Sequence, residues 1–429
     1  MNNSPSKSNP MARVMGLRDF RLLFAGAATS LLGDQFALIA TPWLVLKITN
    51  DPLALGIVLA LEGFPRAVFM LFGGAITDRI SPRLVMLVAN VTRFFLTAIM
   101  AFLVFSGLVQ MWMVYAFGLA FGIVAGFAIP AENSIVPMLV EEQDLQAGNS
   151  LMMGVTQLTG FVGPTIAGIL IGRYSQSDFG IGLAFAIDAF SFVVSAVTLQ
   201  LIRAGKAQKA PAKAAGEENV WKSIRDGIHF MWVNKTLRLM FLVLMAVNFL
   251  IIGPIMVGIP VLANQRLPEG ATAFGLLMSA YAGGNLGGYL IAGSLPRPSG
   301  SRLRVILLLF IAAFGVVIAS MGFIRSTWID FGLNLLLGLG NGFLAILLFT
   351  WIQTNTPKAM LGRMMSLLIL SSNGLMPISQ ALAGVLSKWN LTLLFVIPGA
   401  LVLLVTLVAS FQPELKNLSA SLSAAPAEA

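Results

Sequence analysis

Twelve long apolar runs constrain this sequence more than any other feature. They cover residues 22–46, 53–76, 84–108, 111–129, 150–172, 181–202, 239–262, 273–295, 305–324, 331–352, 364–386 and 391–411. Each is about 20 residues or slightly longer, which is the length that a helix needs to cross roughly 30 Å of hydrocarbon. We therefore predict an all-α membrane protein with twelve transmembrane helices, whose main partner is the lipid bilayer.

The composition excludes several other classes of protein. Of the 429 residues, 57% are hydrophobic and 10% are charged, whereas soluble domains average about 45–50% and 25%. This rules out an ordinary soluble enzyme, a disordered chain and a nucleic-acid-binding protein. Because there is one histidine and no cysteine, we expect no metal, no cofactor and no thiol nucleophile.

The positive charges are distributed unevenly between the two sides of the predicted spans. Twenty of the 27 Lys and Arg residues fall on the side of the amino terminus and five on the opposite side, while Arg66 and Arg93 lie inside spans. The positive-inside rule then predicts a protein of the cell (inner) membrane with both termini in the cytoplasm. The first run is too long for the core of a signal peptide and contains Asp34, so we read it as a retained span.

The spans form two similar halves. FRLLF at 20–24 matches LRLMF at 237–241, and an ordered series of Gly and Pro matches follows at offsets of 218 to 220 residues. This pattern predicts a six-helix unit duplicated in parallel orientation. We expect cytoplasmic tails at 1–20 and 412–429, bundles at 21–203 and 237–411, and a linker at 204–236 that contains an amphipathic helix on the inner leaflet.

The loop GGAITDRISPRLVML between spans two and three resembles the signature of the major facilitator superfamily, usually written G-x-L-A-D-R-x-G-R-[KR]. Gly74, Ile76, Asp78, Arg79 and Arg83 fall on matching positions, whereas Thr77, Ser81 and Pro82 depart from the pattern. The resemblance implies a cytoplasmic latch in which Asp78 caps the amino end of span eleven and a basic residue meets an acid on span four. Glu132 is the candidate for that acid, and the alternative is that these charges serve membrane topology alone.

Further segments resemble the drug and siderophore exporters of this superfamily, in the branch that contains macrolide-efflux and enterobactin-export proteins. They are LLGDQFALIATPWLVLKITNDPLALG in span one and IPAENSIVPMLVEEQDLQAGNSL at 129–151. GFVGPTIAG in span five resembles the antiporter motif G-x-x-x-G-P-x-x-G-G at Gly160, Gly163, Pro164 and Gly168. The resemblance implies a bend in span five and an antiporter that exports a small amphiphilic molecule in exchange for protons, while its two bundles rock about a central site.

Charges inside spans are informative because each costs roughly 2.5–3.5 kcal/mol at the bilayer centre. Asp34, Glu62, Arg66 and Arg93 fall about 14–20 Å from the span ends, near one level with zero net charge. Glu62 and Arg66 either pair with each other on one helix face or take part in coupling. Asp34 either lines the transport path or forms a buried ion pair, and Arg93 either pairs with one of the two acids or contacts the substrate.

Uncharged polar and aromatic residues in the inner spans are candidates for an amphiphilic substrate cavity, with interhelical packing as the alternative. They are Gln35, Phe36, Asn133, Gln157, Asn248, Tyr281, Trp351, Gln353 and Asn373. The glycines of GGNLGG at 283–288 lie inside an apolar run, so they indicate close helix approach and not a nucleotide site.

The function expected from the sequence is secondary active transport by a monomer. A nutrient importer or a lipid transporter on the same scaffold is the alternative. An intramembrane enzyme is disfavoured because the spans contain no convergent acid, nucleophile or metal set, and the absence of a P-loop disfavours a primary pump. The sequence leaves a receptor that does not transport as a further alternative.

Overall fold

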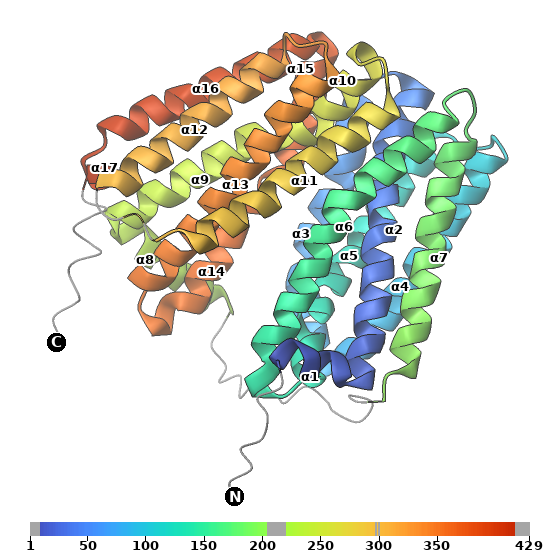
Figure 1. Ribbon diagram of the computed structural model, residues 1–429, viewed down its shortest axis with the longest axis horizontal. Coiled ribbons are helices and arrows are strands. Elements are labelled where there is room, and N and C mark those ends of the chain that lie inside the picture. Colours follow the sequence, from blue (N-terminus) through green and yellow to red (C-terminus); the bar gives the residue numbers. More distant parts are fainter. Residues whose placement is uncertain (1–8, 204–219, 297, 299–300, 417–429) are drawn as a thin grey trace, which may run out of the picture. The chain divides into compact units, whose positions relative to one another are not determined.

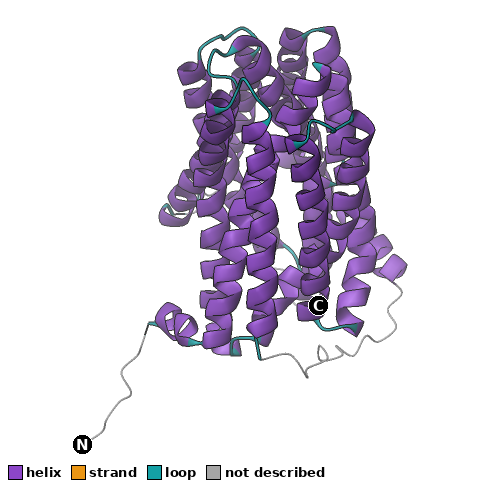
Figure 2. Ribbon diagram, turned by 90° about the vertical axis from the view of Figure 1, so that its right-hand side faces the viewer, coloured by secondary structure: helices purple, strands orange, loops and turns teal. Residues whose placement is uncertain are grey.

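The computed structural model describes residues 9–203, 220–296, 298 and 301–416, and within them every regular element is a helix (Figures 1 and 2). The first six predicted spans are α2 (Arg18–Thr49), α3 (Pro52–Arg79), α4 (Pro82–Phe105), α5 (Met111–Ile135), α6 (Leu145–Arg173) and α7 (Phe179–Leu201). The later spans are α9 (Lys235–Gly253) with α10 (Ile259–Arg266), α11 (Ala271–Ser294), α12 (Ser301–Met321), α13 (Thr327–Asn355), α14 (Lys358–Asn373) with α15 (Met376–Trp389), and α16 (Leu391–Phe411). The shorter helices are α1 (Pro10–Gly16), α8 (Val220–Val233) and α17 (Pro413–Lys416).

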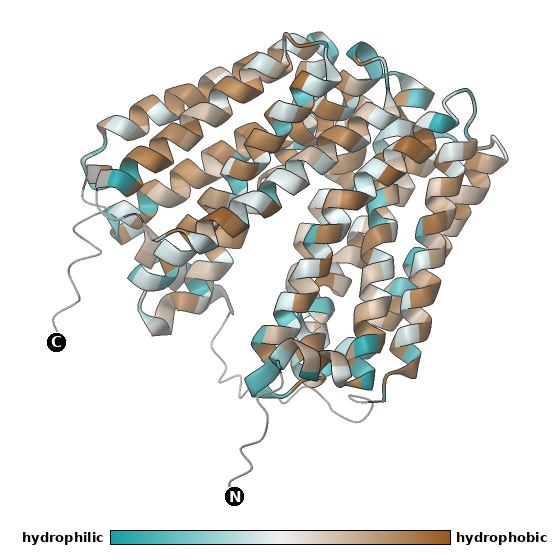
Figure 3. Cartoon of the chain, in the orientation of Figure 1, coloured by the Kyte–Doolittle hydropathy of each residue, from teal (hydrophilic) through white to brown (hydrophobic). Residues whose placement is uncertain are grey.

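The helices agree with the predicted spans to within a few residues. In the described part of the chain, eleven helical segments are long and apolar enough to cross a membrane. The predicted span outside this set is α11, whose GGNLGG segment lowers its apolar content. Figure 3 shows α12 and α16 coloured as apolar over most of their length. The prediction of an all-α membrane protein is confirmed.

Two of the predicted spans are not uniform α-helices. Span seven contains a π-helical turn at Pro254–Gly258, which begins where Pro254 lacks the backbone donor that the α pattern needs. Span eleven consists of two helices, because α14 ends at Asn373 and α15 starts at Met376 with Pro377 in its first turn. Apolar patterning alone does not register these interruptions.

The chain folds into two compact units. One unit contains Met1–Leu44 and Leu61–Ala214, and the other contains Val45–Ala60 and Ala215–Ala429. The division between them near residue 214 lies in the predicted linker, of which residues 204–219 are outside the described part. The helix expected in the linker is present as α8.

Residues 45–60 belong to the second unit through specific contacts. Asn50 has a φ of 48°, in the left-handed region that Asn tolerates, and it reverses the chain between α2 and α3. Next to it, Asp51 caps α3 by accepting a hydrogen bond from the amide of Leu53 at 3.0 Å, and Lys388 of α15 donates to its carboxylate at 2.9 Å. A methyl group on Gly56 would lie 3.0 Å from the Cα atom of Gly384, so α3 and α15 touch backbone to backbone.

Glycines at matching positions of the sequence repeat make the same type of contact in each unit. A methyl group on Gly122 of α5 would lie 2.9 Å from the carbonyl carbon of Glu62 on α3. A methyl group on its repeat equivalent, Gly342 of α13, would lie 3.0 Å from the carbonyl carbon of Asn285 on α11. Asn285 belongs to GGNLGG, so the expected close helix approach is confirmed. In both units these contacts bring the helices that carry candidate site residues close together.

Candidate functional site

The charged candidates of the first unit gather around α3, α4 and α5. Nη1 of Arg66 lies 3.4 Å from Oε1 of Glu62, one turn away on α3. This is the pairing within one helix that was one of the two alternatives for these residues. About 30% of each side chain is exposed, so the pair is accessible from outside the helix.

Arg93 of α4 is buried and its partner is Glu132 of α5. Its Nη1 lies 3.3 Å from Oε1 of Glu132, and 8% of the Arg93 side chain is exposed against 42% for Glu132. The guanidinium carbon lies 5.5 Å from the ring centre of Phe121 and 5.7 Å from that of Phe192, within the range of cation–π attraction. We expected Asp34 or Glu62 as the ion-pair partner, and the structure instead shows Glu132.

Asp34 of α2 lines a cavity of about 330 Å³ in the first unit. The charges of Arg93, Glu132 and Glu62 act on its carboxylate. Glu132 and the predicted cavity residue Asn133 also line this space, and no Lys or Arg is among its described lining residues. The other polar side chains of the wall are Ser30, Asn90, Asn149, Thr156 and Ser195. The structure thus brings Asp34 and Glu132 together on the wall of one cavity, and Glu132 in turn pairs with Arg93.

Asp188 of α7 is a site residue that sequence reasoning missed. Its side chain is fully buried, and neither carboxylate oxygen has a hydrogen-bond partner among the described residues. A methyl group on Gly33 would lie 2.9 Å from its Oδ1, which places Asp188 against the residue that precedes Asp34. A lone ionisable residue inside an apolar span was the signal that could have identified it.

Asp188 changes the expected charge balance. Of the charged residues in the first unit, Asp34 and Glu132 line the cavity. Zero net charge was the expectation from two acids and two bases. Glu132 on α5 and Asp188 on α7 add two acids to that set, because Glu132 pairs with Arg93 and the charges of Asp34 and Arg93 act on Asp188.

The residues of the expected cytoplasmic latch differ in the contacts that they make. Arg83 donates to the carbonyl of Leu199 at 2.6 Å and to that of Gln200 at 3.0 Å, so it binds the carboxyl end of α7 as expected of a cation at a helix C-terminus. A methyl group on Gly74 would meet nothing within 4 Å. Arg79 ends α3 and is exposed, while the side chain of Asp78 lies outside the described part.

The motif of span five lies in one continuous helix, α6, with Pro164 in its interior. Gly160, Gly163, Pro164 and Gly168 all belong to this helix. A methyl group on Gly163 would lie 2.6 Å from the Cβ atom of Gln35 on α2. Gly163 therefore allows α6 to pack directly against the residue that follows Asp34.

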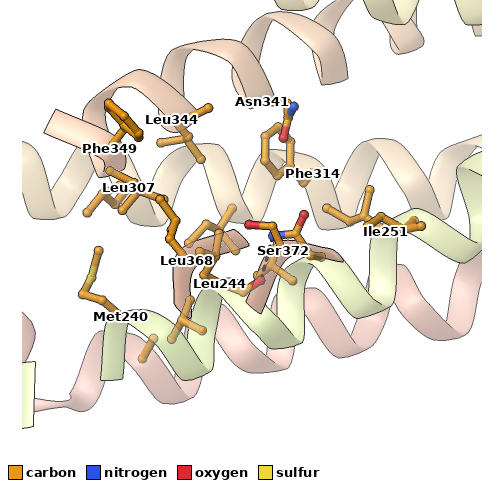
Figure 4. A pocket seen from close by; sticks show the side chains of 18 of the residues that line it. Met240, Leu244, Ile251, Leu307, Phe314, Asn341, Leu344, Phe349, Leu368 and Ser372 are labelled. Atoms are coloured by element: carbon orange, nitrogen blue, oxygen red, sulfur yellow. Dashed lines mark hydrogen bonds between the residues drawn. The ribbon is translucent and has the colours of Figure 1, made fainter. Parts of the chain in front are cut away.

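The second unit contains a separate cavity of about 480 Å³. Asn248 of α9 and Tyr281 of α11, both predicted as cavity residues, line it. Figure 4 shows Met240, Leu244, Leu307, Phe314 and Leu368 on its walls together with the polar side chains of Asn341 and Ser372. No charged residue is among its described lining residues, so the wall is apolar with a few amide and hydroxyl groups.

Five other predicted cavity residues, Gln35, Phe36, Gln157, Trp351 and Gln353, are not among the described lining residues of either space. Phe36 and Trp351 are buried, and the Trp351 indole nitrogen has no hydrogen-bond partner in the described part. Gln35 and Gln157 are half-buried and Gln353 is exposed, whereas the side chain of Asn373 lies outside the described part. Sequence polarity alone does not distinguish cavity walls from helix contacts.

Comparisons with known proteins agree with this architecture. The model of the transmembrane secretion effector family matches residues 10–428. The multidrug efflux pump Tap of Mycolicibacterium fortuitum is 26% identical, over 92% of this chain and 96% of that protein. Macrolide efflux protein A of Streptococcus pyogenes is 21% identical, over 93% and 97%. The crystal structure of the nucleoside transporter NupG superposes with a TM-score of 0.70 at 14% identity, over 91% of this chain and 98% of that chain.

These matches confirm the expected major facilitator fold and the expectation of a transporter and not an enzyme. The family model extends over both units, and the efflux proteins align over nearly their whole length. The chain belongs to the transmembrane secretion effector family of the major facilitator superfamily and is a multi-pass membrane transporter.

Proposed function

We propose that this transporter exports a small amphiphilic molecule across the cell membrane in exchange for protons, by alternating access between two six-helix bundles at 21–203 and 237–411. The observation that carries the proposal is the cavity of the first unit, whose wall contains the two acids Asp34 and Glu132. Relatives named as efflux proteins support the outward direction. The excess of Lys and Arg on one side supports cytoplasmic termini.

Asp34 is the proposed coupling residue because it meets three requirements of a proton carrier. It is on an apolar helix, it lines a cavity, and it lies within the field of Arg93. In a dry site a carboxylate is costly and takes up a proton, whereas a nearby Arg favours release of that proton. Alternation between these two environments couples proton movement to the change of conformation, and each inward proton supplies about 2.3 kcal/mol per 100 mV.

The two cavities support the amphiphilic character of the cargo. Small-molecule sites typically enclose about 300–1,000 Å³, with apolar walls and a few polar groups that fix orientation. The cavity of the second unit has this character, with Asn248, Tyr281 and Asn341 as its polar groups. The wall of the first-unit cavity also combines apolar side chains with polar ones, among them the acids Asp34 and Glu132. A molecule with an apolar body and a polar group matches the character of either cavity taken by itself.

A cytoplasmic latch formed by Gly74, Asp78, Arg79 and Arg83 is proposed as the element that biases the two conformations. An anion at a helix amino terminus contributes about 0.3–1 kcal/mol when exposed, which is enough to shift an equilibrium without locking it. The contacts of Arg83 with the end of α7 support its anchoring part in this element. Glu132 is kept as the proposed acid of the latch, and it also pairs with Arg93 and lines the cavity of the first unit.

The test is transport by the purified protein in proteoliposomes. Thermal stabilisation across a panel of antibiotics, siderophores and lipids first identifies a cargo, and movement of that cargo is then measured with and without a pH gradient. We expect the cargo to move against its concentration gradient only when protons flow the other way. Equal movement in the absence of any gradient would contradict proton antiport.

A further inference from the structure

Asp188 occupies an unusual environment for an aspartate. It lies in the middle of α7, its side chain is 0% exposed, and both carboxylate oxygens lack a hydrogen-bond partner in the described part of the chain. The hydroxyl of Ser191, one turn further along, donates to the Asp188 backbone carbonyl at 2.7 Å and not to its carboxylate. A buried carboxylate without donors is strongly disfavoured, and the usual remedy in proteins is to bind a proton.

The charged groups that face Asp188 come from two helices packed around it. The charge of Asp34 acts on it from α2, and the charge of Arg93 acts on it from α4. The guanidinium of Arg93 already pairs with Glu132, so it does not form an ion pair with Asp188. Close contact between α2 and α7 depends on Gly33, because a methyl group there would lie 2.6 Å from the Cβ atom of Ser191.

We propose that Asp188 is a second proton-binding site of the transporter, which exchanges its proton with Asp34 across the contact between α2 and α7. This inference rests on the proposed role of Asp34 in proton coupling. Asp34 lines the cavity and exchanges protons with water. Asp188 is sealed from water and holds the proton while Asp34 is ionised.

The exchange conserves atoms and charge. The O–H bond of the Asp188 carboxylic acid breaks, an O–H bond forms on the Asp34 carboxylate, and the electron pair of the broken bond stays on Asp188. The pair carries one negative charge before and after the step. The charge of Arg93 acts on both carboxyl groups, so it favours the negative charge of the pair in either state.

The chain provides a matched control in Asp330 of the second unit. Its side chain is also 0% exposed, and both of its carboxylate oxygens also lack a partner among the described residues. The charge that acts on it is that of Arg266, whereas Asp34 does not act on it. Asp188→Asn and Asp330→Asn therefore each remove an acid whose side chain is 0% exposed. Of the two acids, Asp188 alone is acted on by the charge of Asp34.

Infrared spectroscopy of the purified full-length protein tests the proposal without knowledge of the cargo. The C=O stretch of a protonated carboxylic acid is separate from the carboxylate bands, and carboxyl ¹³C labelling of the nine aspartates distinguishes them from glutamates. At pH 7 we expect a protonated-aspartate band that Asp188→Asn removes and Asp330→Asn leaves. Asp34→Asn should shift this band. Any band that Asp330→Asn removes should keep its position in Asp34→Asn.

Either of two results would overturn the proposal: no loss of a protonated-aspartate band in Asp188→Asn, or an Asp188 band that Asp34→Asn leaves unchanged. Should Asp188→Asn not fold, the response of the remaining bands to Asp34→Asn in the Asp330→Asn background still decides the question. A transport assay separates this inference from the proposed function. Transport independent of protons would refute the proposed function while the infrared result stands.

Discussion

Arg93 on α4, which is buried, forms an ion pair with Glu132 on α5, which is partly exposed, with Nη1 and Oε1 separated by 3.3 Å. The guanidinium of Arg93 lies 5.5 Å from the ring centre of Phe121 and 5.7 Å from that of Phe192, whereas Glu132 lines the same cavity as Asp34. The pair thus connects the aromatic interior of the first unit to its polar cavity, and its charges act on Asp34 from close by.

Loss of the glutamate should destabilise the protein because Arg93 would remain buried without its partner. We expect Glu132→Gln to cost about 1–2 kcal/mol, below the cost for a fully buried pair since Glu132 is half exposed. Arg93→Met should lower the free energy of unfolding by less in the Glu132→Gln variant than in the wild type. A double-mutant cycle of unfolding free energies measures this difference. Strictly additive effects would show that the two side chains do not interact.

The ion pair between Asp51 and Lys388 should make the stability of the second unit depend on pH. The hydrogen bond from Lys388, aided by the amide of Leu53, lowers the pKa of Asp51 below its usual range. The contribution of Asp51 to the free energy of unfolding is therefore fully present above the pKa of about 4 that an aspartate has in the unfolded chain. It is lost as the pH falls through the lower pKa of Asp51 in the folded protein.

Asp51→Asn should accordingly reduce stability at pH 7 by less than about 1 kcal/mol, with the difference from wild type shrinking in acid and in high salt. Thermal unfolding in detergent at a series of pH values measures this. A difference that grows toward low pH would contradict the sign of the effect.

Close helix contacts at the repeat-matched glycines should not tolerate a methyl group. Gly122→Ala would press against the backbone of Glu62, and we expect a loss of about 1–3 kcal/mol from overpacking. The control is Gly154→Ala on α6, where nothing lies within 4 Å and alanine should be neutral or slightly stabilising. Equal thermal stability of the two variants would argue against backbone contact between α3 and α5.

Filling the cavity of the second unit should weaken cargo binding. Leu244 lines this cavity, whereas Leu242 on the same helix is 40% exposed. We expect Leu244→Trp to reduce affinity for an identified cargo at least tenfold, or about 1.4 kcal/mol, and Leu242→Trp to leave affinity unchanged. Calorimetric titration of the two variants measures this, and equal affinities would remove the cavity from the binding site.

The sequence was sufficient to predict the helical spans, because hydrocarbon thickness fixes both their length and their apolar character. It did not predict that span eleven divides between Asn373 and Met376, or that residues 45–60 pack with the second unit. Apolar runs report burial in lipid or protein alike, so they do not distinguish which helices touch.

The candidate site was predicted in part. Asp34, Glu62, Arg66 and Arg93 were identified by the cost of charge in hydrocarbon, and the structure places them in one unit. Which acid Arg93 pairs with depends on which faces of α4 and α5 meet, and the apolar pattern of the sequence does not report this. Asp188 obeys the same cost argument, so its omission was an error of reasoning and not a limit of the sequence.

The central claim is that Asp34 couples cargo export to proton flow, and the most direct measurement is gradient-driven transport by Asp34→Asn in proteoliposomes. We predict that this variant loses acceleration by a pH gradient and still exchanges cargo down its concentration gradient. Undiminished gradient-driven transport by Asp34→Asn would contradict the claim.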